Sequence, residues 1–502
     1  MDGPPDGAPV RAGPPPGTPP CGGRPRADVR RPTLAVMTTS PAPRRDDTTT
    51  SRRHRGRPCP TAAEGARSRP RTAPLLPPQV RAPEVLRVGD PRDLVALVPH
   101  QLGFVPARSL VLVSLRGPRR RVGLVSRVDL PALADRERAL LALRQVPADL
   151  VDLLGRLVDH AVDLAVRDGA SAVVAVVYDD AVPADLLGGG HPGGPDPRDL
   201  SLAGLVDVLV AGACVGRGLR LGDAWWVDGD RLRRLGCRDA CCPPEGEPLA
   251  ALDGSLAAVE MVARGSAPLR SRDALLDDLR PAAADAREEA VRAAATARRR
   301  TRRAEGDPAR AARLRADALA SFRGAVEVER LAAPPGGDAP GRRGPAEDLH
   351  DPVLLGRVGA ALADPWVRDA VLVSCLAGAG DVPERVAAEG PDERAEALLE
   401  AVVGRPAGAA VPDPALVAAA ERVLAAVVRH LPDRVGAHAL GALAWTAWWS
   451  GDGARAVACA ERALGVRPAV PMARLVLDLV DAGAVPAWVR ARRQDDEEAP
   501  AG

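Results

Sequence analysis

The chain has 502 residues, a net charge of +2, 46% hydrophobic residues and only 2% aromatic residues, a composition typical of a globular protein with two or three domains. All 68 basic residues are arginine, so the sequence lacks the lysine that a Walker A phosphate loop, a protein kinase and a Schiff-base enzyme each require. It also contains neither G-x-S-x-G nor H-E-x-x-H, which excludes the commonest hydrolase elbow and the zinc-protease helix.

The hydrophobic pattern and the cysteine pattern both bear on location. No run approaches the roughly 20 apolar residues that a membrane-spanning helix requires, and the N-terminus lacks the apolar core of a signal peptide. Eight cysteines at irregular spacing in a chain of this length do not resemble the dense disulfide framework of small secreted domains. We therefore expect a soluble protein in a reducing cytoplasm.

The first 80 residues contain 14 arginines and 6 acidic residues, together with many prolines and glycines. Such a segment has too few apolar side chains to form a core. We therefore expect a disordered tail over 1–82, although its positive charge could also attract nucleic acid or acidic surfaces.

The first structured stretch is predicted to be a helix followed by a hairpin. Asp90 and Pro91 form a typical helix start, because Asp caps free backbone N–H groups and Pro fits the first turn. Pro99 should end or kink that helix. The apolar run from 110 to 115 predicts a strand that is buried on both faces, and a turn after it leads into a second strand over 122–130.

The next elements alternate between helix and strand. Apolar residues recur at helix spacing through 148–168, and a fully apolar strand follows over 171–178. A second helix is expected to run to about Arg217, and a hairpin turning at Asp228 and Gly229 completes the order α-β-β-α-β-α-β-β. This order predicts a mixed α/β domain whose sheet includes at least one parallel crossover.

The second half of the chain is predicted to be helical. Helices are expected over 282–331, with a break at Gly306, and over 351–400 and 414–430. Small residues between 440 and 468 follow the spacing of a tetratricopeptide-like helical hairpin.

These patterns divide the chain into an α/β N-terminal domain and an α-helical C-terminal domain, each expected to have its own core. The predicted segments are a disordered arginine-, proline- and glycine-rich tail (1–82), the mixed α/β domain (83–265), a helical arm and linker (266–345), the helical domain with its tetratricopeptide-like hairpin (346–490), and a disordered acidic tail (491–502).

Three phrases in the sequence are similar to a known family. They are DLVALVPHQLGFVPARSLVLV near the start of the α/β domain, CCPPEG at 241–246, and ALAWTAWWSGDGARAVACAERAL in the predicted helical hairpin. Together they resemble an actinobacterial family catalogued as domain of unknown function 4192, over Val85 to Val489. The resemblance implies no activity and supplies no catalytic or binding residues.

Acidic residues follow two of the predicted strands. Asp179 and Asp180 come directly after the strand over 171–178, and Asp129, with Arg127, ends another. Ligands gather at the carboxyl ends of strands in open α/β sheets, so these residues could form a catalytic site that holds a divalent cation or a phosphate-bearing ligand. The alternative is that they end strands and cap turns, as acidic residues commonly do.

The densest group of reactive side chains in the sequence is Cys237, Cys241 and Cys242. Three thiols within six residues could bind zinc, with Cys214 or His191 as the fourth ligand. They could equally form a reversible disulfide, or remain inert thiols, because adjacent cysteines seldom bind one metal ion together. The sequence leaves all three interpretations open.

Two polar segments can each be interpreted either as a binding site or as ordinary surface structure. The glycine-rich loop at 188–197 lies between a strand and a helix, where phosphate loops occur, but its length and its prolines favour a lid or a linker. The run from Arg298 to Arg303 lies on a predicted helix and could contact nucleic acid. Its lack of interleaved aromatic residues favours a solvated, salt-bridged helix.

Trp445, Trp448 and Trp449 share one side of a predicted helix. Such a stripe usually belongs to a core, although it could instead anchor a protein partner on the C-terminal helices.

The favoured hypothesis is a cytoplasmic, non-catalytic binding or regulatory protein, because the standard catalytic motifs are missing and the helical end is typical of partner-binding modules. Two alternatives remain: an enzyme that performs metal-assisted hydrolysis near Asp129 and Asp179, and a nucleic-acid binder that uses its arginine-rich segments. The sequence specifies neither a cofactor nor an oligomeric state.

Overall fold

The computed structural model describes residues 34–37, 90–179, 196–332, 349–404 and 408–498. Asp180, His191 and the linker that follows residue 332 lie outside the described residues, as do most of the glycine-rich loop and of the predicted N-terminal tail. Within that tail, Leu34–Met37 forms strand β1, which the sequence analysis did not predict.

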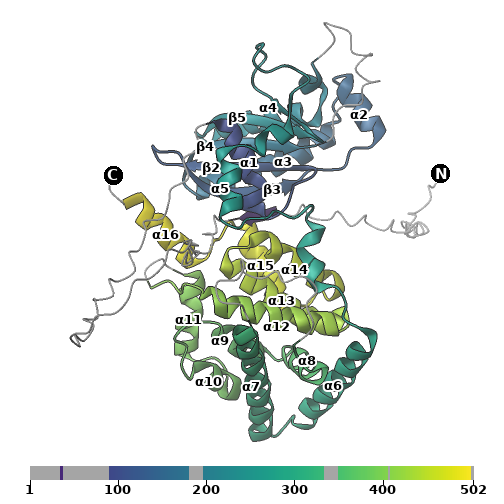
Figure 1. Cartoon of the computed structure of the whole chain (residues 1–502), viewed down its shortest axis with the longest axis vertical. Helices are drawn as coiled ribbons and strands as arrows, with labels where there is room; N and C mark the ends of the chain where they lie inside the picture. The colour runs from purple at the N-terminus through teal and green to yellow at the C-terminus, as the bar shows by residue number, and fades with distance from the viewer. Residues whose placement is uncertain (1–33, 38–89, 180–195, 333–348, 405–407, 499–502) are drawn as a thin grey trace, which may run out of the picture. The chain divides into compact units, whose positions relative to one another are not determined.

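The α/β part is built on one seven-stranded mixed sheet in the order β1-β3-β2-β4-β5-β6-β7 (Figure 1). The strands after β1 are β2 (Ser109–Arg116), β3 (Arg121–Asp129), β4 (Ala170–Tyr178), β5 (Arg220–Asp228), β6 (Arg231–Arg234) and β7 (Glu247–Pro248). Strands β4 and β5 are parallel and a helix connects them, which confirms the predicted crossover. The other neighbours pair antiparallel, among them the two predicted hairpins, β2–β3 and β5–β6.

Helices cover both faces of this sheet, and the continuous apolar run of β2 explains why (Figure 1). Its even-numbered residues, such as Leu110, are buried in the same cluster as α3 and α4, while odd-numbered residues, such as Val111, are buried with α1 and α5. The bounds are α1 (Pro91–Leu102), α2 (Asp135–Ala142), α3 (Ala148–Arg167), α4 (Leu202–Gly216) and α5 (Leu256–Ala263), with short 3-10 turns η2 (Pro197–Leu200), η3 (Leu249–Leu252) and η4 (Asp273–Leu279).

The start of α1 follows the predicted capping chemistry. The Asp90 carboxylate accepts a hydrogen bond from the backbone N–H of Arg92 at 2.9 Å, and Pro91 occupies the first helical position. Pro99 does not end the helix, which continues to Leu102, a fully buried residue. The helix ends instead at Gly103, whose φ of 75° suits glycine.

The rest of the described chain is helical. Its elements are α6 (Ala284–Arg303), α7 (Pro308–Ala332), α8 (Pro352–Ala361), α9 (Pro365–Ser374), α10 (Val382–Glu389), α11 (Glu393–Val403), α12 (Pro414–His430), α13 (Asp433–Ser450), α14 (Gly453–Val466), α15 (Pro471–Asp481) and α16 (Ala487–Glu498). The segment 351–400 forms four helices, because Asp364 with Pro365, the turn at Gly378 and Gly380, and then Gly390 interrupt it. Helices α13 and α14 form the predicted hairpin and turn at Gly451.

Two expectations for this half differ from the structure. The acidic tail predicted over 491–502 is helical as far as Glu498, in α16. The two halves also do not have separate cores, because one cluster of contacting buried side chains extends from α3 and α4 into the C-terminal helices. Gly483 shows how close they are: a Cβ atom there would lie 2.5 Å from a methyl carbon of Leu164 in α3. None of the described helices is both long and apolar enough to cross a membrane.

Candidate metal centre

Three cysteine side chains meet on the loop that follows β6. The Sγ atom of Cys241 lies 3.8 Å from that of Cys237 and 3.8 Å from that of Cys242, and the three Sγ atoms all lie within 4.8 Å of one another. A turn closed by a 2.9 Å hydrogen bond from the N–H of Cys242 to the carbonyl of Asp239 folds this segment back on itself. Cys241 is exposed and the other two are half-buried.

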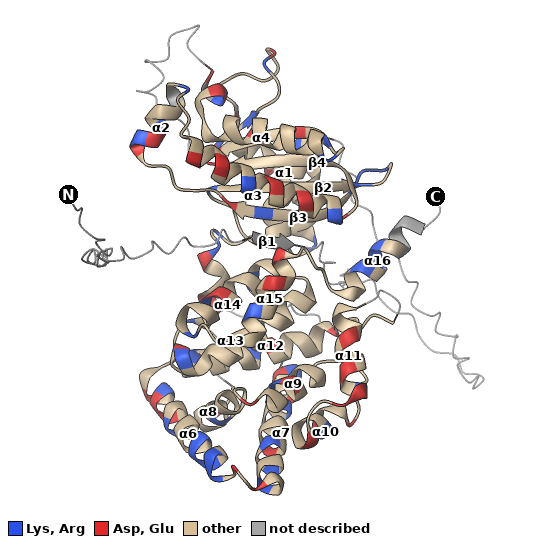
Figure 2. Ribbon diagram, turned by 180° about the vertical axis from the view of Figure 1, so that it is seen from behind, with Lys and Arg blue, Asp and Glu red and all other residues tan. Residues whose placement is uncertain are grey.

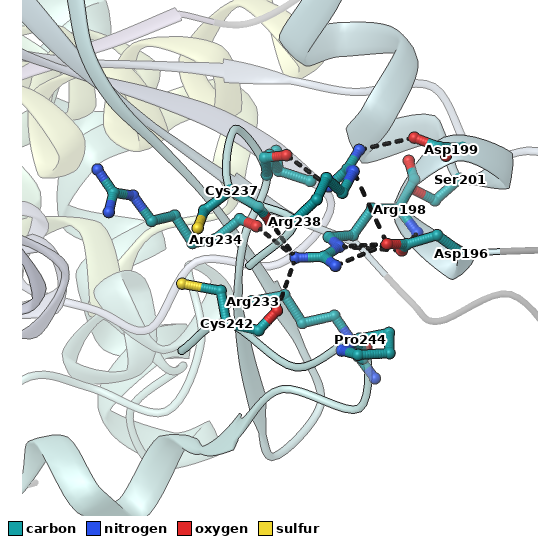
Figure 3. A network of polar contacts seen from close by, with 11 residues as sticks. Asp196, Arg198, Asp199, Ser201, Arg233, Arg234, Cys237, Arg238, Cys242 and Pro244 are labelled. Atoms are coloured by element: carbon teal, nitrogen blue, oxygen red, sulfur yellow. Dashed lines mark hydrogen bonds and ion pairs between the residues drawn. The ribbon is translucent and has the colours of Figure 1, made fainter. Parts of the chain in front are cut away.

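A single buried arginine fixes both ends of the cysteine segment. Arg198 is only 2% exposed, and its Nη1 donates hydrogen bonds to three main-chain carbonyls (Figure 3). These are the carbonyls of Arg234 at 3.0 Å, Cys237 at 2.6 Å and Cys242 at 3.1 Å. Because the first and last cysteines accept hydrogen bonds from the same guanidinium group, their backbones cannot move apart without breaking a buried hydrogen bond.

The orientation of Arg198 is set by a carboxylate. Its Nε and Nη2 donate to Asp196 at 2.9 and 2.6 Å, and the same carboxylate caps η2. Burial acts to raise the pKa of Asp196, but its hydrogen bonds with Arg198 outweigh burial and leave that pKa below its usual value. Asp196 is therefore held as an anion beside a cation, which gives the loop a rigid support.

Sequence reasoning missed Arg198 and Asp196, although a signal for them was present. The phrase D-P-R-D-L occurs at 90–94 and again at 196–200. In both copies Asp caps a helical turn and the arginine two residues later folds back onto that Asp, since Arg92 Nε bonds Asp90 at 2.9 Å in the first copy. The repeat could have identified the local ion pair, but not the carbonyls that Arg198 contacts.

Glycine is required at the far side of the loop. Gly246, the last residue of the CCPPEG phrase, has a φ of +72°. A Cβ atom at this position would lie 2.7 Å from the main-chain oxygen of Leu232 in β6. Any other residue would therefore push the loop away from the strand that supports it.

The thiols differ in acidity. A hydrogen bond from the backbone of Asp239 lowers the pKa of Cys237, and a side-chain hydrogen bond with Cys242 lowers it further. Burial, followed by the influence of the two neighbouring thiols, raises the pKa of Cys242 to about 11. Cys237 is therefore expected to ionise first, and Cys242 is expected to ionise only when a cation offsets its burial.

The sulfur separations suit a tetrahedral metal ion. Zinc–thiolate bonds of about 2.3 Å in tetrahedral geometry place the sulfur atoms about 3.8 Å apart. The Sγ atom of Cys241 lies at this distance, 3.8 Å, from the Sγ atoms of both Cys237 and Cys242. All three cysteines are free thiols. The loop thus brings together three sulfur atoms that could act as ligands of one ion.

Cys214 does not join this group, which corrects its prediction as a fourth ligand. It lies in α4, is 1% exposed and packs in the core shared with α3. Burial raises the pKa of its thiol to about 11. The other suggested ligand, His191, lies outside the described residues. Among the residues that the structure describes, the site consists of three thiols.

The strand-end residues lie at the same end of neighbouring strands, and Asp129 is already paired with arginine. Asp129 and Tyr178 flank Ser109 in neighbouring strands, so β3 and β4 end in the same row. Asp129 forms an ion pair with the buried Arg127 and lies 3.9 Å from Arg272. Asp179, 7% exposed, accepts a hydrogen bond from the indole of Trp226 through its main-chain oxygen. The predicted partner Asp180 lies outside the described residues.

The three tryptophans of α13 are core residues. Trp445, Trp448 and Trp449 are 7%, 3% and 1% exposed, and the first two rings lie 5.3 Å apart. The indole N–H groups of Trp448 and Trp449 donate to the main-chain oxygens of Ala484 and Ala410. This burial corrects the alternative that the three anchor a partner, because their rings do not reach the surface.

Comparison with known proteins agrees with the phrases noted in the sequence. The family model described as Domain of unknown function (DUF4192) matches residues 91–419 and 393–487, which is more than half of the chain. No curated protein and no solved structure matches this chain. The match includes strands β2 to β7 of the sheet, the cysteine loop and most of the helices described above. The chain therefore belongs to the DUF4192 family, a family of unknown function.

Proposed function

We propose that this chain is a non-catalytic binding or regulatory protein of the cytoplasm, and that Cys237, Cys241 and Cys242 bind a thiophilic divalent cation such as Zn²⁺. The observation that carries the proposal is the mutual approach of the three Sγ atoms, at the spacing of thiolates around one tetrahedral ion. A reducing compartment would keep these thiols available as ligands.

The support beneath the thiols favours a built site over three accidental neighbours. Arg198 bonds the main-chain carbonyls of the loop and is itself held by Asp196, as residues around metal ligands commonly are. The exposed position of Cys241 leaves the fourth direction accessible to a water molecule or to a ligand atom of a partner. A site of this kind suits a metal-dependent contact or a metal sensor more than a closed structural centre.

The alternative of metal-assisted hydrolysis at Asp129 and Asp179 receives less support. Asp129 already faces two arginines, and Arg272 is in turn paired with Glu461 at 2.7 Å. A cation at this edge would have to compete with both guanidinium groups for the same carboxylate.

Titration with Co²⁺ and Cd²⁺ tests the proposal directly. We expect one equivalent of metal per chain, with a sulfur-to-metal charge-transfer band, and competition by Zn²⁺. Cys237→Ser and Cys241→Ser should each lower the affinity by about tenfold or more, because each removes a thiolate ligand. Cys214→Ala is the matched control and should bind as tightly as the wild type, since that thiol lies in the core.

Two other outcomes would contradict the metal site. If mild oxidation of the metal-free protein removes thiols in pairs and no metal binds to the reduced form, the cluster is a redox pair. If neither metal nor oxidant changes the thiol count, the cysteines are inert.

The metal affinity is also expected to rise with pH. A thiol must lose its proton to bind, and the pKa of Cys242 is raised to about 11. Near neutral pH the apparent affinity should therefore increase by about tenfold per pH unit for each thiol that is still protonated before binding. Measurement of the Zn²⁺ affinity by chelator competition between about pH 6 and pH 8 checks this. An affinity that does not change over this range would mean that thiols are not the ligands.

A further inference from the structure

Helices α6, α7 and α8, with the start of α9, line one cleft. A short turn at 304–307 joins α6 to α7, and α8 packs between them. Two pockets of about 400 and 440 Å³ adjoin in this cleft and share Thr301, Leu314 and Ala361. Each has the volume of a site for a small ligand or for part of a larger one.

The cleft carries a concentration of positive charge. Between 290 and 316 the chain has nine arginines and two acidic residues. The two pockets are lined by six arginines (Arg292, Arg298, Arg300, Arg302, Arg315 and Arg357) and by three carboxylates (Glu289, Asp317 and Asp364). The whole chain carries +2 and its first 80 residues carry +8, so the remainder carries −6. Figure 2 shows basic residues along α6. This segment is therefore strongly basic within a part of the protein that is acidic as a whole.

Most of the arginines between 290 and 316 lack the acidic partners that a salt-bridged surface helix would give them. In the described part of the chain, no carboxylate pairs with Arg298, Arg299, Arg300, Arg302, Arg303 or Arg357. One turn earlier in α6 the usual pairing is present, because Arg292 bonds Glu288 at 2.6 Å.

The sequence of α6 explains this difference. The positions four residues before Arg298, Arg299 and Arg300 hold Ala294, Ala295 and Thr296, none of which can form an ion pair. Asp307, at the turn, uses its carboxylate to cap α7 through the N–H of Arg310. The arginine run is therefore solvated, but within the described residues it lacks the ion pairs of a salt-bridged helix.

From this charge and this lack of partners we infer that the cleft binds the phosphate backbone of a nucleic acid. Arginine guanidinium groups match phosphate oxygens in geometry and charge. From Arg298 to Arg303 the arginine run of α6 extends about 8 Å at 1.5 Å per residue, about two phosphate spacings along one DNA strand. Arg357 of α8, which lines the first pocket with Arg292 and Arg300, adds a cation from a second helix.

The same features predict recognition of charge without recognition of sequence. Trp366 is the aromatic residue that lines the cleft, and its ring is already covered by Arg315, whose guanidinium carbon lies 4.2 Å from the ring centroid. Arg315 is held there by Asp364 at 2.7 Å. With this ring covered, bases have no free stacking platform on it, and the contacts are to phosphates.

The test uses fluorescence anisotropy of a labelled DNA duplex of arbitrary sequence with the full chain at low salt. The cleft variant combines Arg298→Gln, Arg300→Gln and Arg302→Gln. We expect it to bind about tenfold more weakly and to lower the slope of log affinity against log salt by about 2 to 3. The corresponding triple lysine variant should retain most of the affinity, because a phosphate backbone responds mainly to charge.

The matched control removes the same charge from the basic N-terminal segment, through Arg52→Gln, Arg53→Gln and Arg55→Gln. Its binding should change less than that of the cleft variant. Equal losses in the two variants would show that net charge alone attracts DNA and would overturn the proposal, as would unchanged binding by the cleft variant. Tighter binding of a polyglutamate chain than of DNA would assign the cleft to an acidic protein instead. Thermal unfolding of each variant confirms that exposed substitutions leave the fold intact.

Discussion

Replacing Glu329 with glutamine is expected to lower the free energy of unfolding by about 3 kcal/mol, because the change removes the anion from a buried ion cluster. Glu329 is 6% exposed near the end of α7. Its carboxylate lies 3.1 Å from Nε2 of His350 and accepts a hydrogen bond from Nε of Arg422 at 2.7 Å. Since Arg422 belongs to α12, loss of this carboxylate leaves a largely buried cation unpaired between two helices.

The effect should depend on pH with a defined sign. Burial acts to raise the pKa of Glu329, but the hydrogen bonds of His350 and Arg422 outweigh burial and leave that pKa below its ordinary value. A carboxyl with a lowered pKa stabilises the fold above its unfolded pKa, and this contribution is lost as pH falls through the folded pKa. The difference between wild type and variant should be complete at neutral pH and shrink in acid, as measured by urea unfolding.

Glu327, two residues earlier in α7, offers a matched control. Its side chain is 55% exposed and pairs with Arg330, which is also exposed. Glu327→Gln should change the free energy of unfolding by less than about 0.5 kcal/mol. Similar losses for the two glutamine variants would contradict the importance assigned to the buried cluster.

The elements of the sheet could be predicted because their signals are local. The apolar run of β2, the capping pair at Asp90 and Pro91, and the turn at Gly229 each depend on neighbours in sequence. Strand β1 could not be predicted in this way. It lies in a proline- and arginine-rich segment and exists by pairing with a distant edge, as Leu34 does with Val128 of β3.

The same distinction applies to the candidate metal centre. Its three thiols lie within six residues, so their approach was a local expectation. Arg198 contacts carbonyls 36, 39 and 44 residues further along the chain, and a main-chain carbonyl has no signature in a sequence. The prediction of Cys214 as a fourth ligand was wrong because its side of α4 faces the core. Composition alone could not show which way that side chain points.

Glu421 provides the second large effect, with the opposite sign from Glu329. It is 6% exposed in α12, and its Oε1 atom has no hydrogen-bond partner within the described chain. The pKa of its carboxyl is raised from 4.5 to about 7, chiefly by burial; Arg455 and Thr446 act to lower it, and Asp452 and Asp278 act to raise it. Between about pH 4.5 and pH 7.5, the wild type should therefore lose about 3 kcal/mol more unfolding free energy than Glu421→Gln.

The sign follows from where the proton is held. Between the unfolded and folded pKa values the native state keeps a proton that the unfolded chain has released, so stability falls as pH rises and then becomes constant above the folded pKa. Glutamine has the shape of the protonated acid and cannot ionise, so the variant lacks this fall. Urea unfolding across the range tests the difference, with the exposed Glu396→Gln in α11 as the control that should follow the wild type. Parallel profiles for wild type and Glu421→Gln would mean that the carboxylate finds a cation or water in its site, with Arg455 the nearest candidate because it already pairs with Asp278 at 2.6 Å.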